Sequence, residues 1–98
     1  MLERQKIDQI AKEVATSNLG AANVAHVASE PTTDSEGRDA LKITIIIQPD
    51  ALERISGDAA LDTLVNMQKK LHQAGEERFA ILEYATQEEL DLVDDIEP

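Results

Sequence analysis

Apolar residues recur every three or four positions near the start of the chain. They form a stripe made of Ile7, Ile10, Ala11 and Val14, and most charged residues of this stretch lie opposite it. This spacing predicts an amphipathic helix over residues 1–15. Asn18 and Gly20 are typical of a helix end, so the chain should leave the helix there.

A different period, alternation of every second residue, indicates a strand over residues 40–48. Its inward-facing positions are Leu41, Ile43, Ile45 and Ile47, which alternate with Lys42, Thr44, Ile46 and Gln48. A shorter strand is predicted over residues 23–30, and Pro31 is expected to end it because proline cannot donate to a sheet ladder. Residues 31–39 are rich in turn formers, which predicts an exposed loop between the two strands.

The second half of the chain continues with a helix, a strand and a helix. The longer helix is predicted to start after Ser56 and to end at Gly75, with an apolar face of Ala60, Leu64, Met67, Leu71 and Ala74 flanked by Leu61 and Val65. Residues 79–85 read as a third strand. Thr86 and Glu89 then form a Thr-x-x-Glu capping box for a last helix that carries Leu90, Val93 and Ile96.

This order of elements predicts one α+β domain over residues 1–98, a single three-stranded sheet with helices packed mainly on one face. The first two strands should pair antiparallel, and the long helix allows the third to run parallel to the second. We expect the strand at 40–48 to be central, because Ile46 makes it apolar on parts of both faces. Residues 86–98 are expected to be an acidic helix or tail.

The order of elements is similar to that of type II KH domains and BolA-like proteins. The four glycines, at 20, 37, 57 and 75, form no GxxG loop of the KH type, and the histidine and arginine signature of BolA-like proteins is absent. The similarity is therefore one of topology, and no family is identified from it.

Charge is concentrated at the carboxyl end. The net charge is −11, and residues 76–98 hold nine acidic residues and one basic residue. Such an end repels phosphate backbones and anionic lipid, which disfavours nucleic acid and membranes as partners. The chain has no cysteine and no continuous apolar stretch near its start, so the cytoplasm is the simplest expected location.

No catalytic, cofactor or metal motif emerges. His26 and His72 are the only side chains that ordinarily titrate near neutral pH, and neither belongs to a recognisable ligand or triad pattern. Carboxylates cluster around Gly37 in residues 34–39, but their spacing is not that of a calcium-binding EF-hand. We therefore predict no cofactor and no metal site, and treat an enzyme without a recognisable motif as a minor alternative.

The leading interpretation is a non-enzymatic protein-interaction or homo-oligomerising domain. The sheet face away from the helices would carry Ile46, joined either by Phe79 and Ile81 or by Leu82 and Tyr84 of the third strand. An apolar patch there would seek a partner, and Ile46, Leu82 and Tyr84 are the residues we expect in it. A homodimer of this kind should be lost in Ile46→Asp. The alternative is that the predicted last helix folds over this patch, since Leu90, Val93 and Ile96 also need burial.

The acidic end supports a second interpretation, an antitoxin-like or inhibitor protein that masks a basic site on another protein. Its candidate contact residues are Glu88, Glu89, Asp91, Asp94 and Asp95. Charge complementarity would make such binding fast and sensitive to salt. A KH-like nucleic-acid-binding module is a third interpretation, which rests on element order alone and conflicts with the net charge.

Overall fold

The computed structural model describes residues 2–89. Its regular elements are α1 (Arg4–Leu19), η1 (Ala21–Asn23), β1 (Val24–Thr33), β2 (Asp39–Ile47), η2 (Pro49–Ala51), α2 (Gly57–Gln73) and β3 (Phe79–Thr86). Residues 87–89 are helical, and the predicted Leu90, Val93 and Ile96 of the last helix lie outside the described residues. The predicted α+β class is confirmed.

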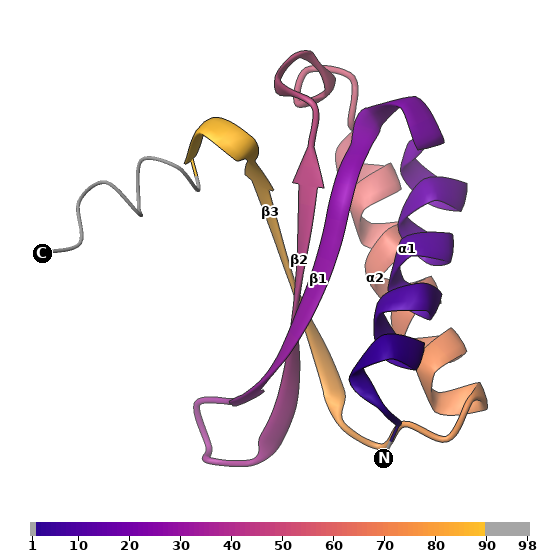
Figure 1. Cartoon of the computed structure of the whole chain (residues 1–98), viewed down its shortest axis with the longest axis vertical. Helices are drawn as coiled ribbons and strands as arrows, with labels where there is room; N and C mark the ends of the chain where they lie inside the picture. The colour runs from indigo at the N-terminus through magenta and orange to yellow at the C-terminus, as the bar shows by residue number, and fades with distance from the viewer. Residues whose placement is uncertain (1, 90–98) are drawn as a thin grey trace, which may run out of the picture.

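The three strands form one mixed sheet in the order β1-β2-β3. β1 and β2 are antiparallel, β2 and β3 are parallel, and β2 is central, as the sequence predicted. Both long helices cover the same face of the sheet, while the other face has neither of them over it (Figure 1). The register aligns Ile45 of β2 with Val27 on one side and Tyr84 on the other.

β1 ends three residues later than predicted, because it runs through Pro31 to Thr33. Pro31 lies opposite Leu41 inside the ladder. A proline is tolerated there because β1 is an edge strand, on which a missing N–H need not break a ladder hydrogen bond. The loop is correspondingly short, and the Asp34 carboxylate organises it by accepting the backbone N–H groups of Glu36 and Arg38, each at 2.9 Å.

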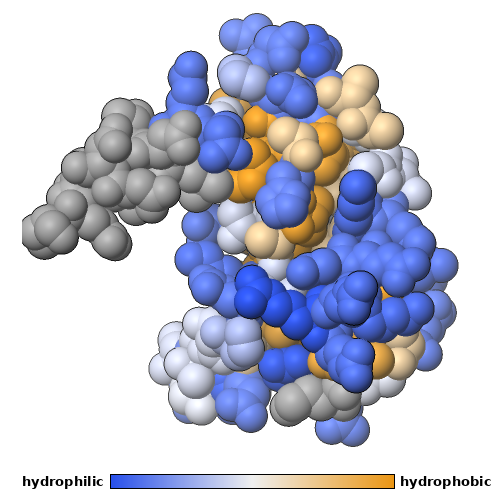
Figure 2. All heavy atoms as spheres, in the orientation of Figure 1, coloured by the Kyte–Doolittle hydropathy of each residue, from blue (hydrophilic) through white to orange (hydrophobic). Residues whose placement is uncertain are grey.

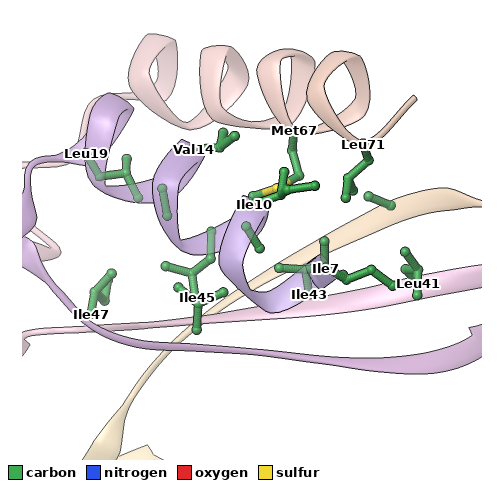
Figure 3. Close-up of a cluster of buried hydrophobic side chains, with 14 of the residues drawn as sticks. Ile7, Ile10, Val14, Leu19, Leu41, Ile43, Ile45, Ile47, Met67 and Leu71 are labelled. Atoms are coloured by element: carbon green, nitrogen blue, oxygen red, sulfur yellow. The ribbon is translucent and has the colours of Figure 1, made fainter. Parts of the chain in front are cut away.

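The core lies between the sheet and the helices. Side chains from α1 point at the inward row of β2, and α2 closes the far side with Met67 and Leu71 (Figure 3). The buried members of this cluster include Ile7, Ile10, Val14, Leu41, Ile43, Ile45, Ile47, Met67 and Leu71. This aliphatic packing follows the two periodicities in the sequence, which gives each element one apolar side.

The helix ends match the predicted capping residues. The Ser56 hydroxyl accepts the Ala59 N–H at 3.1 Å at the start of α2, and Gly20 and Gly75 adopt positive φ angles of 96° and 105° after the two helices. Glu89 donates its backbone N–H to the Thr86 hydroxyl at 3.3 Å, and this hydroxyl donates to the Glu89 carboxylate at 3.2 Å. The Thr86 hydroxyl thus caps the helical residues that follow β3, which is the N-cap half of the predicted capping box.

Candidate protein-interaction site

The two edges of the sheet are built differently. β1 has a register shift between Val24 and His26, contains Pro31, and is held to α1 by a buried hydrogen bond from the Ser29 hydroxyl to the Asp8 carboxylate. Bulges and prolines are the usual means by which proteins prevent an edge strand from pairing with another chain. β3, with the sequence FAILEYAT, has no proline, glycine or lysine, and its register with β2 is unbroken.

The outer edge of β3 is covered at a single residue by a side chain of α2. The Gln68 amide donates to the Ala80 carbonyl at 2.7 Å and accepts the Ala80 N–H at 3.1 Å, so it imitates one residue of a neighbouring strand. Backbone groups alternate in direction along a strand, so the N–H and C=O groups of Leu82 and Tyr84 point the same way as those of Ala80. Within residues 2–89 no strand lies beside them.

An apolar stripe on α2 runs beside this edge. Leu61, Leu64 and Val65 share a side of the helix with Gln68, because residues spaced by three, four and seven positions lie on one face. Leu61 and Val65 are 59% and 56% exposed. The Gln68 contact with Ala80 shows that this side of α2 faces the outer edge of β3.

Two further apolar residues flank the same edge on the face of the sheet away from the helices. Phe79 and Ile81 are 57% and 36% exposed, and they align with Ala40 and Lys42 of β2. The described part of the chain has five large exposed hydrophobic residues. Four of them lie on β3 or beside its outer edge. The fifth, Leu52, lies in the turn after η2. In this turn the Arg54 guanidinium donates a hydrogen bond to the Asn23 side-chain oxygen, beside β1, at 3.0 Å.

The rest of the surface is mostly polar. On the face seen in Figure 2, hydrophobic residues form one group in the upper part, and hydrophilic residues surround it and dominate the lower half. Lys42 on the sheet is shared between Glu30 at 3.8 Å and Glu83 at 3.4 Å. The Glu83 carboxylate, the only charge on β3, thus has a cation beside it.

The predicted contact residues lie elsewhere than expected. Ile46 is on the face away from the helices, between His26 and Ala85, but it is only 2% exposed. Leu82 and Tyr84 are on the helix-covered face and pack against the core. The alternative set, Phe79 and Ile81, is the one that shares a face with Ile46.

The Tyr84 side chain is part of the core and is not a reactive group at the surface. Burial raises the pKa of its phenol, and the neighbouring Thr63 hydroxyl offsets part of that shift. Thr63 donates its own proton to the Ala59 carbonyl at 2.7 Å, and the Tyr84 hydroxyl has no hydrogen-bond partner among the described residues. The Tyr84 side chain is partly buried against the core, and its backbone N–H and C=O lie at the outer edge of β3.

The described residues include only two of the five acidic contact residues that the sequence predicted. Glu88 and Glu89 belong to the helical residues after β3, and the Glu89 carboxylate accepts the Thr86 hydroxyl. Asp91, Asp94 and Asp95 lie outside the described residues. An acidic contact surface formed by all five therefore stays a prediction.

The candidate reactive groups do not converge in the described residues. His26 and His72 are both exposed, one on β1 and one near the end of α2. Residues 2–89 contain no group of three or more histidine or acidic side chains arranged to hold a metal ion. The Asp34 carboxylate is occupied by backbone N–H groups and by the Arg38 guanidinium at 2.9 Å, which lower its pKa.

A groove of about 630 Å³ lies between α1 and α2. It is lined by both polar and apolar side chains, among them Lys6, Glu13 and Lys70, and the Asn66 amide donates to the Asn18 carbonyl oxygen at 2.9 Å across it. Its lining includes the Ser17 hydroxyl and the Glu13 carboxylate, and in the described part of the chain no hydrogen bond joins the two as a nucleophile and its base. The arrangement gives no specific chemistry.

Comparison with known proteins adds no functional information. No protein-family model matches the chain, and neither a curated protein nor a solved structure matches it. Within the described residues, no helix combines the length and apolar character needed to cross a membrane.

Sequence reasoning found part of the β3 site and missed the rest. Phe79 and Ile81 were one of two alternatives, and Leu61 and Val65 were assigned to the flank of a buried face. Gln68 was missed, although its spacing from Leu61, Leu64 and Val65 is visible in the sequence. What the sequence does not reveal is that this side of α2 meets an edge strand.

Proposed function

We propose that this chain is a non-enzymatic protein-interaction domain that binds a protein partner by adding a strand to the outer edge of β3. The observation that carries the proposal is the contrast between the two edges: β1 is bulged and contains Pro31, whereas β3 is regular and bordered by exposed apolar residues. Strand addition uses main-chain hydrogen bonds for affinity and flanking side-chain contacts for specificity.

The chemistry of the edge supports this mode of binding. Leu82 and Tyr84 offer backbone donors and acceptors, and apart from Glu83 and Thr86 the side chains of the strand are hydrophobic. An incoming strand would cover Phe79 and Ile81 with alternate residues on one face, which removes apolar surface from water at roughly 25 cal/mol per Å². Because the chain has no cysteine, a reducing compartment suits it, and we propose that it acts in the cytoplasm.

Photo-cross-linking at the edge tests this function directly. We expect a photoreactive benzoylphenylalanine at Phe79, a conservative replacement, to form covalent protein adducts in cells. The same group at Leu52 is the control, since this residue is 49% exposed but belongs to the turn tied to η1. Adducts at Phe79 and none at Leu52 are the expected result, and equal labelling at the two positions, or none at either, contradicts the proposal.

A further inference from the structure

We infer that the strand received by β3 is β3 of a second copy of this chain, so that two sheets join antiparallel into one six-stranded sheet. The inference rests on the proposed function and adds the identity of the partner. It is carried by the shape and charge of the surface around the edge.

The exposed apolar residues around the outer edge of β3 lie in two layers, the sheet and the helix α2. An isolated strand at the edge would meet Phe79 and Ile81, but Leu61 and Val65 belong to the helix layer that covers one face of the sheet. Their exposure calls for a partner that presents an apolar helix beside its strand. A second copy has this arrangement. A two-fold axis would place the apolar stripes of the two α2 helices against each other and the outer edges of the two β3 strands against each other.

The exposed backbone limits where the two strands meet. Gln68 occupies the N–H and C=O of Ala80, so pairing must run through Leu82 and Tyr84. A two-fold axis centred on Tyr84 keeps the two Glu83 carboxylates out of direct opposition, which is unfavourable for like charges in a sheet. The Gln68 amide thus sets the register as well as covering one residue.

The charge of the surface is compatible with self-association despite the net charge of −11. Leu61, Leu64, Val65 and Gln68 are neutral, and Glu83 has Lys42 at 3.4 Å. The repulsion between copies comes from charges outside the contact, and salt screens it over a Debye length of about 8 Å at physiological ionic strength. Added salt should therefore strengthen a homodimer, whereas it would weaken a complex with a basic protein.

Sedimentation equilibrium of the full chain over a range of concentrations and salt tests the inference. We expect a monomer–dimer equilibrium that shifts toward dimer as salt rises from low to physiological. Val65→Glu and Leu61→Glu should each raise the dissociation constant by at least about tenfold, because each places a charge where the two α2 stripes meet. Leu52→Glu is the matched control and should leave it unchanged, and far-UV circular dichroism verifies that all variants are folded.

The outcomes separate the inference from the function on which it rests. A chain that stays monomeric at roughly 1 mM in every salt overturns the homodimer. Photo-cross-links from residue 79 to a different protein would then leave the proposed function standing. A dimer that weakens in Leu52→Glu but not in Val65→Glu or Leu61→Glu places self-association elsewhere and overturns the homodimer through β3, whereas the photo-cross-links alone decide the proposed function.

Discussion

Glu76→Gln is expected to lower the free energy of unfolding by about 3 kcal/mol, because it removes the charge of a buried ion pair and leaves its partner uncompensated. The Glu76 side chain has no exposed surface, and that of Arg78 is 12% exposed. Arg78 Nε and a terminal guanidinium nitrogen donate to the two carboxylate oxygens at 2.9 and 3.0 Å. Urea denaturation measures the loss.

The effect of this substitution should reach beyond the ion pair. The Glu76 carboxylate also accepts the backbone N–H groups of Leu2 and Arg78, each at 3.0 Å, so it joins the start of the chain to the turn between α2 and β3. Asp50→Asn is the control, since Asp50 forms an exposed pair with Arg54 at 3.3 Å and should cost less than about 1 kcal/mol. Equal losses in the two variants would contradict the structural role of Glu76.

The same carboxylate predicts how stability depends on pH. The Arg78 guanidinium, with the backbone N–H groups of Arg78 and Leu2, lowers the pKa of Glu76 from 4.5 to about 2. A lowered pKa in the folded state means that the contribution is complete above pH 4.5 and is lost as pH falls toward 2. It amounts to at most about 3 kcal/mol. Glu76→Gln should remove this part of the acid sensitivity, and an unchanged pH profile would contradict the assignment.

Ile46→Asp is expected to unfold the chain, with a loss of at least about 4 kcal/mol, because it places an unpaired carboxylate at a buried position. Ile46 is 2% exposed and lies on the central strand between His26 and Ala85. Circular dichroism and urea denaturation report the outcome. A folded Ile46→Asp chain with the unfolding midpoint of the wild type would show that the position is not buried.

Ile81→Asp provides the comparison, since Ile81 is on the same face of the sheet but 36% exposed. We expect it to change the free energy of unfolding by no more than about 1 kcal/mol, in keeping with partly exposed positions. The contrast also changes what Ile46→Asp can test. Because Ile46→Asp unfolds the chain, a loss of association in that variant says nothing about an interface. Ile81 variants stay folded and therefore test the edge of β3 alone.

Much of the fold could be predicted because its signals are local and periodic. The alternation over residues 40–48 identified the central strand, and the capping residues Ser56, Gly75 and Thr86 marked helix ends correctly. The end of the first strand was wrong, because a proline reads as a strand breaker unless the strand is known to be an edge. This knowledge requires the tertiary arrangement.

The parts of the site that could not be predicted depend on which elements meet. Glu76 belongs to the acidic end of the sequence, and nothing local distinguishes it from its exposed neighbour Glu77. Ile46 has the pattern of a residue on an open face, yet its side chain is only 2% exposed. The contact between Gln68 and Ala80 joins a helix to a strand edge through a single amide, which leaves no periodic signal.

Amide hydrogen exchange along β3 tests the central claim, that this strand has one outer edge ready to pair. In the dilute chain or in the monomeric Val65→Glu variant, the Leu82 and Tyr84 amides should exchange rapidly, while those of Ile81 and Glu83, directed at β2, are protected. Binding of the partner strand should slow exchange at Leu82 and Tyr84. Equal protection of all four amides in the monomer would contradict the account, because the edge would already be covered.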